Sequence, residues 1–448
     1  MSLHTLTLRA GRIALHSAAG ALFLAGMACS GALDVPNPQA FGDDALNNPI
    51  ILKTVADGAE GSVHQAYDDM IQITELNSDD MESTSTWIDW EDISEGRLRH
   101  DWPTPGSFSF PQDLLLRARF AAQSAKERVD NVLGTAAGTS PLRAQVMLMD
   151  AIADLLFGMS ACEGPLTADA ARSPDTEFFK QAVTKFTAAL TAAQAISGDA
   201  AAKAKWTDVA YAGRARANLL AGNYAAAKTD AQAVSAGFVY NALYQELAQS
   251  ATGNQFHQNR NRSGGLRRMY HARVHEIDPA PTGTGEAYLR DWFDNTKDDK
   301  RMAVTRKTGQ LGVNNRFAYY GITKYNDRNA PIRMFSKIEM TLIEAEAAFR
   351  VNDYATMTTL LNSLRTRAGV ALPAIPVPAS AAEAQAALLN ERQAELFVEG
   401  HRQQDLHRFN MVNSLLGPGH ATKLPLSRNE ILNNANMTDG GGACPSVS

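Results

Sequence analysis

The residues with the clearest chemical spacing lie near the C-terminus, where Glu391, Glu395 and Glu399 follow one another at intervals of four. On a helix this spacing places the carboxylates on one face, and two carboxylates one turn apart can reach the separation that the acid and the nucleophile of a glycoside hydrolase need. Catalysis would require one carboxyl with a raised pKa, but Arg392 and Arg402 stand close by and would lower it. Because apolar residues interrupt the charged run, we interpret these five residues as a partly buried structural charge network.

No other group of residues has the spacing of a catalytic or metal site. His401 and Asp405 stand four residues apart, but no third and fourth ligand follows at a recognisable spacing. The side chains of the adjacent pairs Asp79–Asp80 and Asp298–Asp299 diverge, so we expect these pairs to cap turns. A glycine-rich phosphate loop and a nucleophile elbow are also missing from the sequence. We therefore predict a binding protein with no catalytic residues, no metal and no cofactor.

Aromatic residues gather in two polar stretches of the chain. Sugar rings present apolar C–H faces that stack on aromatic rings, while polar neighbours bind the hydroxyl groups. We therefore regard five aromatic residues as candidate ligand-binding platforms: Trp87, Trp90, Trp102, Trp292 and Tyr320. The alternative is that these rings pack half-buried beneath loops, as Trp and Tyr more often do.

A second candidate ligand surface is basic. Residues 257–275 contain no acid and five arginines, namely Arg260, Arg262, Arg267, Arg268 and Arg273. In an acidic chain this reversal of sign favours an anionic ligand or an acidic partner surface. The alternative is a solvated loop with scattered ion pairs.

These stretches need a scaffold, and the sequence predicts a mainly α fold. Residues 141–235 and 335–370 carry apolar residues at helical spacing, in helix pairs joined by short turns such as Ala221-Gly222-Asn223. This layout is tetratricopeptide-like, with each helix pair covering the apolar face of the next. Residues 77–112 and 250–334 lack the periodicity, so we predict that they form long irregular loop excursions that carry the ligand contacts.

The N-terminus has the features of an export signal peptide. Residues 1–28 contain two arginines and no acid, and their apolar run is too short and too rich in Gly and Ala for a transmembrane helix. Cys29 follows at once, at the position where bacterial lipoproteins are acylated. Ordinary cleavage after Ala28 is the alternative, because the preceding residues are small. We predict a lipid on Cys29 and a tether at residues 29–40 that leads into a single domain over residues 29–448.

The chain has 3 cysteines. Acylation of Cys29 leaves Cys162 and Cys444 as an even pair in an oxidising compartment, where a disulfide can form between them. Two separate thiols are the alternative, because the sequence does not fix the distance between their Cα atoms.

The net charge limits the classes of partner. The chain has 42 basic and 48 acidic residues and a net charge of −6. Removal of the predicted signal peptide, which is basic, makes the rest more negative. A general nucleic-acid or anionic-membrane binder would carry a basic field instead. We expect no nucleic-acid partner, and contact with the membrane only through the lipid.

Several segments resemble a known protein family. These are residues 336–347 (SKIEMTLIEAEA), 361–370 (LNSLRTRAGV), 390–402 (NERQAELFVEGHR) and 424–431 (LPLSRNEI). They are similar, in this order, to the paired helices and to the C-terminal signature of the SusD/RagB family of outer-membrane nutrient-uptake lipoproteins, so residues 385–448 are identified as that signature. The resemblance implies a lipid-anchored protein on the surface of the outer membrane that captures a nutrient oligomer for a SusC-like TonB-dependent transporter. An oligosaccharide is the favoured ligand, and an exported glycoside hydrolase and a helical-repeat adaptor without its own ligand remain as alternatives.

Overall fold

The computed structural model describes most of the chain between Gly42 and Met437. The residues described are 42–98, 111–246, 253–257, 270–272, 299, 301–302, 304–311, 313 and 318–437. The chain divides into two compact units, Met1–Asn48 and Pro49–Ser448. Within the first unit only residues 42–48 are described, and they contain the 3-10 helix η1 (Asp43–Asn47).

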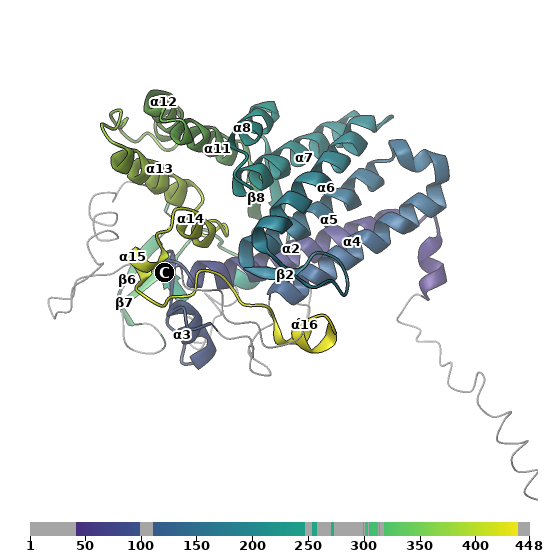
Figure 1. Cartoon of the computed structure of the whole chain (residues 1–448), viewed down its shortest axis with the longest axis horizontal. Coiled ribbons are helices and arrows are strands. Elements are labelled where there is room, and N and C mark those ends of the chain that lie inside the picture. The colour runs from purple at the N-terminus through teal and green to yellow at the C-terminus, as the bar shows by residue number, and fades with distance from the viewer. Residues whose placement is uncertain are drawn as a thin grey trace, which may run out of the picture. The chain divides into compact units, whose positions relative to one another are not determined.

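Helices of the second unit form a stack in which neighbours in sequence are neighbours in space (Figure 1). The stack contains α4 (Pro111–Leu133), α5 (Pro141–Ser160), α6 (Asp175–Ala195), α7 (Ala200–Leu220), α8 (Tyr224–Ala233), α11 (Lys337–Arg350), α12 (Tyr354–Arg365) and α13 (Ala381–Glu395). A further helix, α2 (Leu52–Leu76), packs against α4 and α5. The predicted mainly α fold is confirmed. Helices α5 to α8 lie within residues 141–235, and α11 and α12 lie within residues 335–370.

Local sequence explains where these helices begin and end. The Ser140 side chain caps α5 by accepting a hydrogen bond from the Leu142 N–H at 3.2 Å, and Pro141 follows at the first helical position. Between α7 and α8 the backbone turns at Gly222, whose φ of 81° suits glycine. Between α11 and α12 the backbone turns at Asn352, which also has a positive φ, of 59°.

Three apolar cores lie in the described part of the second unit. The larger core lies mainly among α2 and the helices from α4 to α8, and a smaller one lies among α11, α12 and α13. The third is a small cluster of Leu52, Val129 and Ala137. Small residues allow close approach in the larger core, because a Cβ atom at Gly213 of α7 would overlap the ring of Phe186 of α6. The alanine-rich composition of these helices therefore serves tight helix packing.

The two excursions are less irregular than predicted. The first contains β1 (Met81–Ser83) and α3 (Ile88–Ser94), and the second contains β5 (Tyr270–Ala272), β6 (Val304–Leu311), β7 (Ala318–Ile322) and β8 (Ile332–Ser336). Among the residues described, strands pair only in antiparallel twos: β1 with β5, β6 with β7, β8 with β4 (Val239–Ala242), and β2 (Glu163–Pro165) with β3 (Arg172–Pro174). Except for β6, with eight residues, these strands are only three to five residues long and give too little alternation for a sequence pattern to reveal them.

After α13 the chain forms three short helices, α14 (Arg402–Arg408), α15 (Val412–Leu416) and α16 (Arg428–Asn433). Between α15 and α16, Leu424 forms an isolated parallel bridge with Ala161. This bridge ties the segment before α16 to the end of α5.

Candidate functional site

The C-terminal signature is not one helix, contrary to the spacing argument. Helix α13 ends at Glu395, and the chain turns before α14 begins at Arg402. Val398 and Gly400 have φ angles of 50° and 77°, which a continuous helix does not allow. Glu399 therefore lies in the turn rather than on the helical face that carries Glu391 and Glu395.

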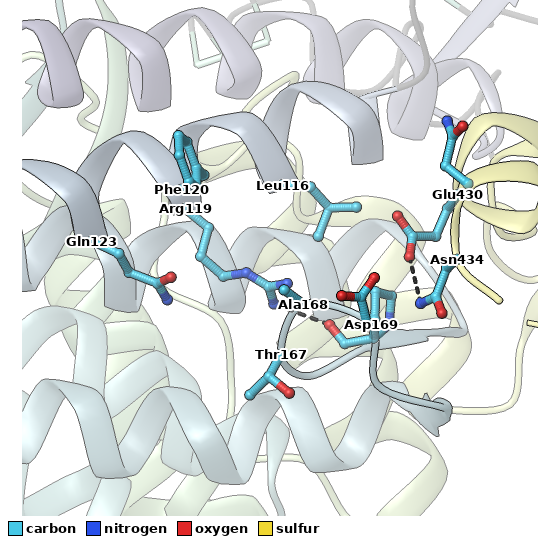
Figure 2. Close-up of a pocket in the computed structure, with 11 residues that line it drawn as sticks. Leu116, Arg119, Phe120, Gln123, Thr167, Ala168, Asp169, Glu430 and Asn434 are labelled. Atoms are coloured by element: carbon cyan, nitrogen blue, oxygen red, sulfur yellow. Dashed lines mark hydrogen bonds between the residues drawn. The ribbon is translucent and has the colours of Figure 1, made fainter. Parts of the chain in front are cut away.

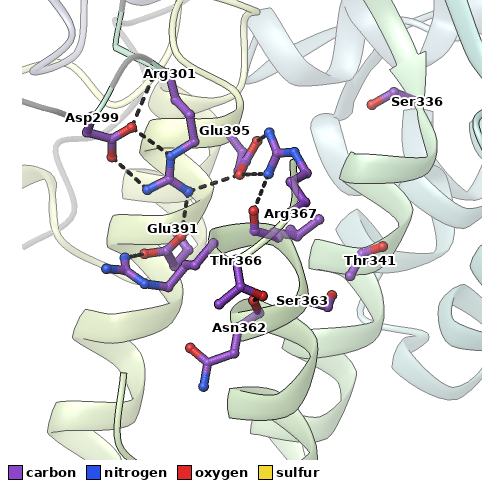
Figure 3. A network of polar contacts seen from close by, with 12 residues as sticks. Asp299, Arg301, Ser336, Thr341, Asn362, Ser363, Thr366, Arg367, Glu391 and Glu395 are labelled. Atoms are coloured by element: carbon purple, nitrogen blue, oxygen red, sulfur yellow. Dashed lines mark hydrogen bonds and ion pairs between the residues drawn. The ribbon is translucent and has the colours of Figure 1, made fainter. Parts of the chain in front are cut away.

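Glu391 and Glu395 bind a basic residue of the second excursion. Arg301 donates from Nη1 to Glu391 Oε2 at 2.6 Å and to Glu395 Oε1 at 2.9 Å, and its Nη2 pairs with Asp299 at 2.6 Å (Figure 3). Arg367 from the end of the α12 region also binds Glu395, with Nη2 to Oε2 at 2.8 Å. The side chains of Glu391 and Glu395 are 4% and 1% exposed, so no substrate reaches them for hydrolysis.

Glu399 holds the later part of the same excursion. Its carboxylate accepts hydrogen bonds from Lys324 Nζ at 2.5 Å and from Arg333 Nε at 2.9 Å. Its backbone carbonyl accepts one from the hydroxyl of Tyr67 on α2 at 2.8 Å. The neighbouring carbonyl of Val398 accepts one from Tyr325 Oη at 3.0 Å.

Residues on both sides of the turn between α13 and α14 hold the first excursion. Arg402 forms a bidentate pair with Asp79 at 2.6 and 2.7 Å, and Gln393 donates to Asp80 at 2.8 Å. The prediction that Asp79 and Asp80 cap turns was wrong, because both carboxylates are buried and face the C-terminal signature. Asp299 does cap a turn as predicted, because its carboxylate accepts a hydrogen bond from the Arg301 N–H at 3.1 Å, and it also pairs with the Arg301 side chain.

Carboxylates at the end of α2 crowd together beneath this turn. Burial, followed by repulsion from Asp79, raises the pKa of Asp80 to about 6. Burial and repulsion from Asp80 raise the pKa of Glu75 well above its usual range, although Glu75 accepts hydrogen bonds from the N–H groups of Gly400 and His401. Both pKa shifts favour the protonated form of these carboxyl groups, and the charge of Arg402 acts against the shift of Asp80 by lowering its pKa.

Arg392 belongs to a further buried group of charges. It pairs with Asp405 at 2.7 Å, and Arg408 bridges Asp405 and Glu346 of α11. Burial alone would raise the pKa of Asp405, but Arg392 and Arg408 hold it well below its usual range. This group joins α13, α14 and α11, so it stabilises the end of the helical stack.

The charge network therefore fixes two distant parts of the chain to one segment. The two excursions also pair directly, since Met81 of β1 lies opposite Ala272 of β5. Sequence analysis found the carboxylates of the signature but did not identify Arg301, Lys324 and Glu75 as their partners and neighbours. Only tertiary structure brings these residues together.

The five aromatic residues predicted to stack on a ligand differ in their exposure and in whether the structure describes them. Trp87 precedes α3 and is 45% exposed, beside Ile88, which is 69% exposed. Trp90 is 2% exposed and packs in the larger core, so its ring offers no open face to a ligand. Trp102 and Trp292 lie outside the described residues, and only the backbone of Tyr320 is described, in β7. Trp87 is thus the candidate that remains at a described surface.

Other predicted residues fall in parts of the chain that the structure does not describe. Cys29, Cys444 and the five arginines of the basic run, Arg260, Arg262, Arg267, Arg268 and Arg273, are all outside the described residues. Cys162 is disulfide-bonded, and its partner is also outside them. The Cys162–Cys444 pairing stays a prediction, which peptide mapping without reductant tests directly.

The described part of the chain lacks a membrane-spanning helix and a cluster of metal ligands. No helix there is long and apolar enough to cross a membrane. The same residues contain no group of three or more His, Cys, Asp or Glu placed to hold a metal ion.

Comparison with known proteins gives the family. The chain is similar to a solved putative sugar-binding protein of Bacteroides vulgatus, with 16% identity, a TM-score of 0.63, and coverage of 88% of this chain and 98% of that one. It is similar to a SusD superfamily protein of the same organism, with 14% identity, a TM-score of 0.63, and coverage of 86% and 96%. A solved laminarin-binding SusD-like protein matches with 16% identity, a TM-score of 0.57, and coverage of 86% and 98%. No curated protein sequence matches the chain.

These structural likenesses, all at low identity, support the fold. The sequence model of the SusD family matches residues 210–442, more than half of the chain. The matched segment includes α8, the second excursion and the whole C-terminal charge network. The chain belongs to the SusD family.

Proposed function

We propose that this protein captures an oligosaccharide nutrient at the surface around α3, without breaking bonds, and that Trp87 is the stacking platform. The observation that carries the proposal is the half-exposed Trp87 ring, 45% exposed beside the exposed Ile88. A large aromatic ring open to solvent on a polar stretch suits the apolar face of a sugar. Membership of the SusD family supports the same class of function, and two solved relatives are described as sugar-binding and laminarin-binding.

The ring is supported from below. Trp90 and Ile93 anchor α3 in the core, at 2% and 0% exposed, and the Ser85 hydroxyl accepts a hydrogen bond from the Trp87 N–H at 2.9 Å. The ion pair of Arg402 with Asp79 fixes the chain just before β1. A platform that is already rigid loses little conformational entropy on binding, which favours affinity.

We further propose that Cys29 carries the lipid anchor, that the protein lies on the outer membrane, and that its partner is a SusC-like transporter. The export signal and the cysteine at its end support the anchor. The family match supports the transport role. The buried state of Glu391 and Glu395 argues against the glycoside hydrolase alternative at the C-terminal signature.

The test compares Trp87→Ala with Trp87→Phe. Calorimetry would use a panel of neutral and acidic oligosaccharides and peptides that includes laminarin oligomers. We expect Trp87→Ala to weaken binding by roughly ten- to a hundredfold, because ring contact is lost without leaving a buried charge. Trp87→Phe should keep most of the affinity.

Val351 offers a matched control, because it is also apolar and 72% exposed but lies between α11 and α12. Val351→Ala should not change binding. Oligosaccharide binding that is insensitive to Trp87→Ala would contradict the platform. A wild-type protein that binds its transporter but no ligand of the panel would favour the adaptor alternative.

A further inference from the structure

A pocket lies far from α3 along the chain, between α4, the turn that joins β2 to β3, and α16. Its volume is about 280 Å³. Figure 2 shows Leu116 and Phe120 on α4, Asp169 on the turn, and Glu430 and Asn434 at the α16 end. Leu116 and Phe120 are four residues apart, so they share one face of α4.

Hydrogen bonds fix the walls of the pocket to one another. Arg119 donates from Nη1 to the carbonyl oxygens of Pro165 and Leu166, at 3.0 and 3.2 Å. From the other side, Asn434 donates to the Ala170 carbonyl at 3.0 Å, and Asn436 donates to the Asp169 carbonyl at 2.6 Å. Three segments that are distant in sequence thus form one braced concave surface, and a preformed pocket is what small-ligand sites have.

Phe120 adds an aromatic ring to the apolar part of the lining. The residue is 72% exposed and lies on the same side of α4 as Gln123, which is also exposed. Asp169 has a φ of 57° in the turn opposite, a conformation that costs energy for a residue with a Cβ atom. Among the described residues, Phe120 belongs to no apolar core, so its ring stays open to solvent at the edge of the pocket.

The charges of the pocket select against anions. Asp169 and Glu430 place two carboxylates on the lining. The guanidinium of Arg119 already interacts with Asp154 at 3.3 Å and with two carbonyl groups, so it offers little positive field to a ligand. Carboxylates and the amide of Gln123 are good partners for hydroxyl groups, which donate and accept hydrogen bonds.

We propose that this pocket is a second saccharide subsite, which holds one or two neutral sugar rings with one ring face on Phe120. The volume is slightly below the range of about 300–1,000 Å³ found for drug-sized ligands, so the site suits a terminal or short saccharide. Only the ligand class rests on the proposed function. The pocket shares no residue with the surface around Trp87, so the two sites are separable by mutation.

The test uses the full chain with Trp87→Ala as background, so that the first site is weakened. Glucose, laminaritriose, maltotriose and xylotriose are titrated by saturation-transfer NMR into this protein and into versions that also carry Phe120→Ala or Phe120→Tyr. We expect Phe120→Ala to weaken the remaining binding by about tenfold, and Phe120→Tyr to keep it because the ring is retained. Phe120 is exposed, so both variants should fold, and unchanged thermal unfolding confirms that they do.

One further variant tests the polar side of the pocket. Asp169→Gly removes the carboxylate but tolerates the positive φ, and we expect it to weaken the same binding several-fold. Residual binding that Phe120→Ala leaves unchanged would overturn the subsite while leaving the proposal for Trp87 intact. Binding lost with Phe120→Ala but insensitive to Trp87→Ala would support the subsite and contradict the Trp87 platform. No saccharide binding by the wild-type protein would overturn both.

Discussion

Replacing Arg402 by methionine should destabilise the protein more than any exposed charge replacement. Arg402 is 2% exposed and donates two hydrogen bonds to the carboxylate of Asp79, whose side chain is 7% exposed. Methionine fills similar space without charge, so the main effect is to leave Asp79 buried without this cation. Removing one partner of a buried ion pair costs about 3–5 kcal/mol.

The size of the unit converts this energy into a melting temperature. An unfolding entropy of about 2 cal/mol/K per residue, summed over Pro49–Ser448, gives about 0.8 kcal/mol/K. A loss of about 4 kcal/mol therefore lowers Tm by about 5 °C, measured by circular dichroism at neutral pH. Lys180→Met is the matched control, because its pair with Glu177 is 62% and 42% exposed and should change stability by less than about 1 kcal/mol.

The double variant Asp79→Asn/Arg402→Met shows how much of the lost stability comes from the unpaired charge of Asp79 and how much from altered packing. It removes both charges, so it should be more stable than Arg402→Met alone. Arg402 also lowers the pKa of Asp80, so its loss raises that pKa further, and the deficit of Arg402→Met should shrink as pH falls from 8 to 5. Two results would contradict the buried ion pair. One is an equal Tm for Arg402→Met and Lys180→Met, and the other is a double variant that is less stable than Arg402→Met.

Other predictions follow from single features. Cys29→Ala should move the protein from the membrane to the soluble fraction and remove lipid from its N-terminus by mass spectrometry; an unchanged membrane fraction would contradict the anchor. Burial lowers the pKa of His64 to about 4 from 6.5, so its contribution to stability, on the order of 3 kcal/mol, is present above pH 6.5 and lost as pH falls toward 4. Tm should therefore fall less on acidification in His64→Gln than in the wild type. Gly400→Ala should lower Tm more than Gly222→Ala, because both have positive φ but only at Gly400 would the new Cβ meet a neighbour, Met70 Cε at 2.7 Å.

Helices with a strong local signal were predictable. The turn at Gly222 and the alanine spacing around it located α7 and α8, and the pair α11 and α12 followed the same pattern. Helices α2 and α4 were not predicted, although α2 carries apolar residues at helical spacing, including Val63, Tyr67 and Met70, all fully buried. Polar residues such as Asp68 and Gln72 are also buried on α2 and obscure its amphipathic pattern.

The candidate site was predictable only in part, because its partners are far apart in the chain. The spacing of Glu391 and Glu395 indicated a charge cluster, but Arg301 lies about ninety residues away from both. Trp87 and Trp90 were equivalent in the sequence. The structure separates them because Trp87 lies just before α3 and Trp90 lies on its buried face.

The position of the charge network explains why the family is easier to recognise than the ligand. Glu391, Glu395 and Glu399 each bind residues of the second excursion, and Arg402 binds the first, so changing any of them disturbs the placement of both. Trp87 and Phe120 make no such ion pair and lie at the surface, so they can change without cost to the fold. A scaffold of this kind keeps its signature in buried charges while its ligand contacts vary independently. The sequence signature therefore identifies the scaffold, and only substitutions at exposed residues such as Trp87 and Phe120 report on the ligand.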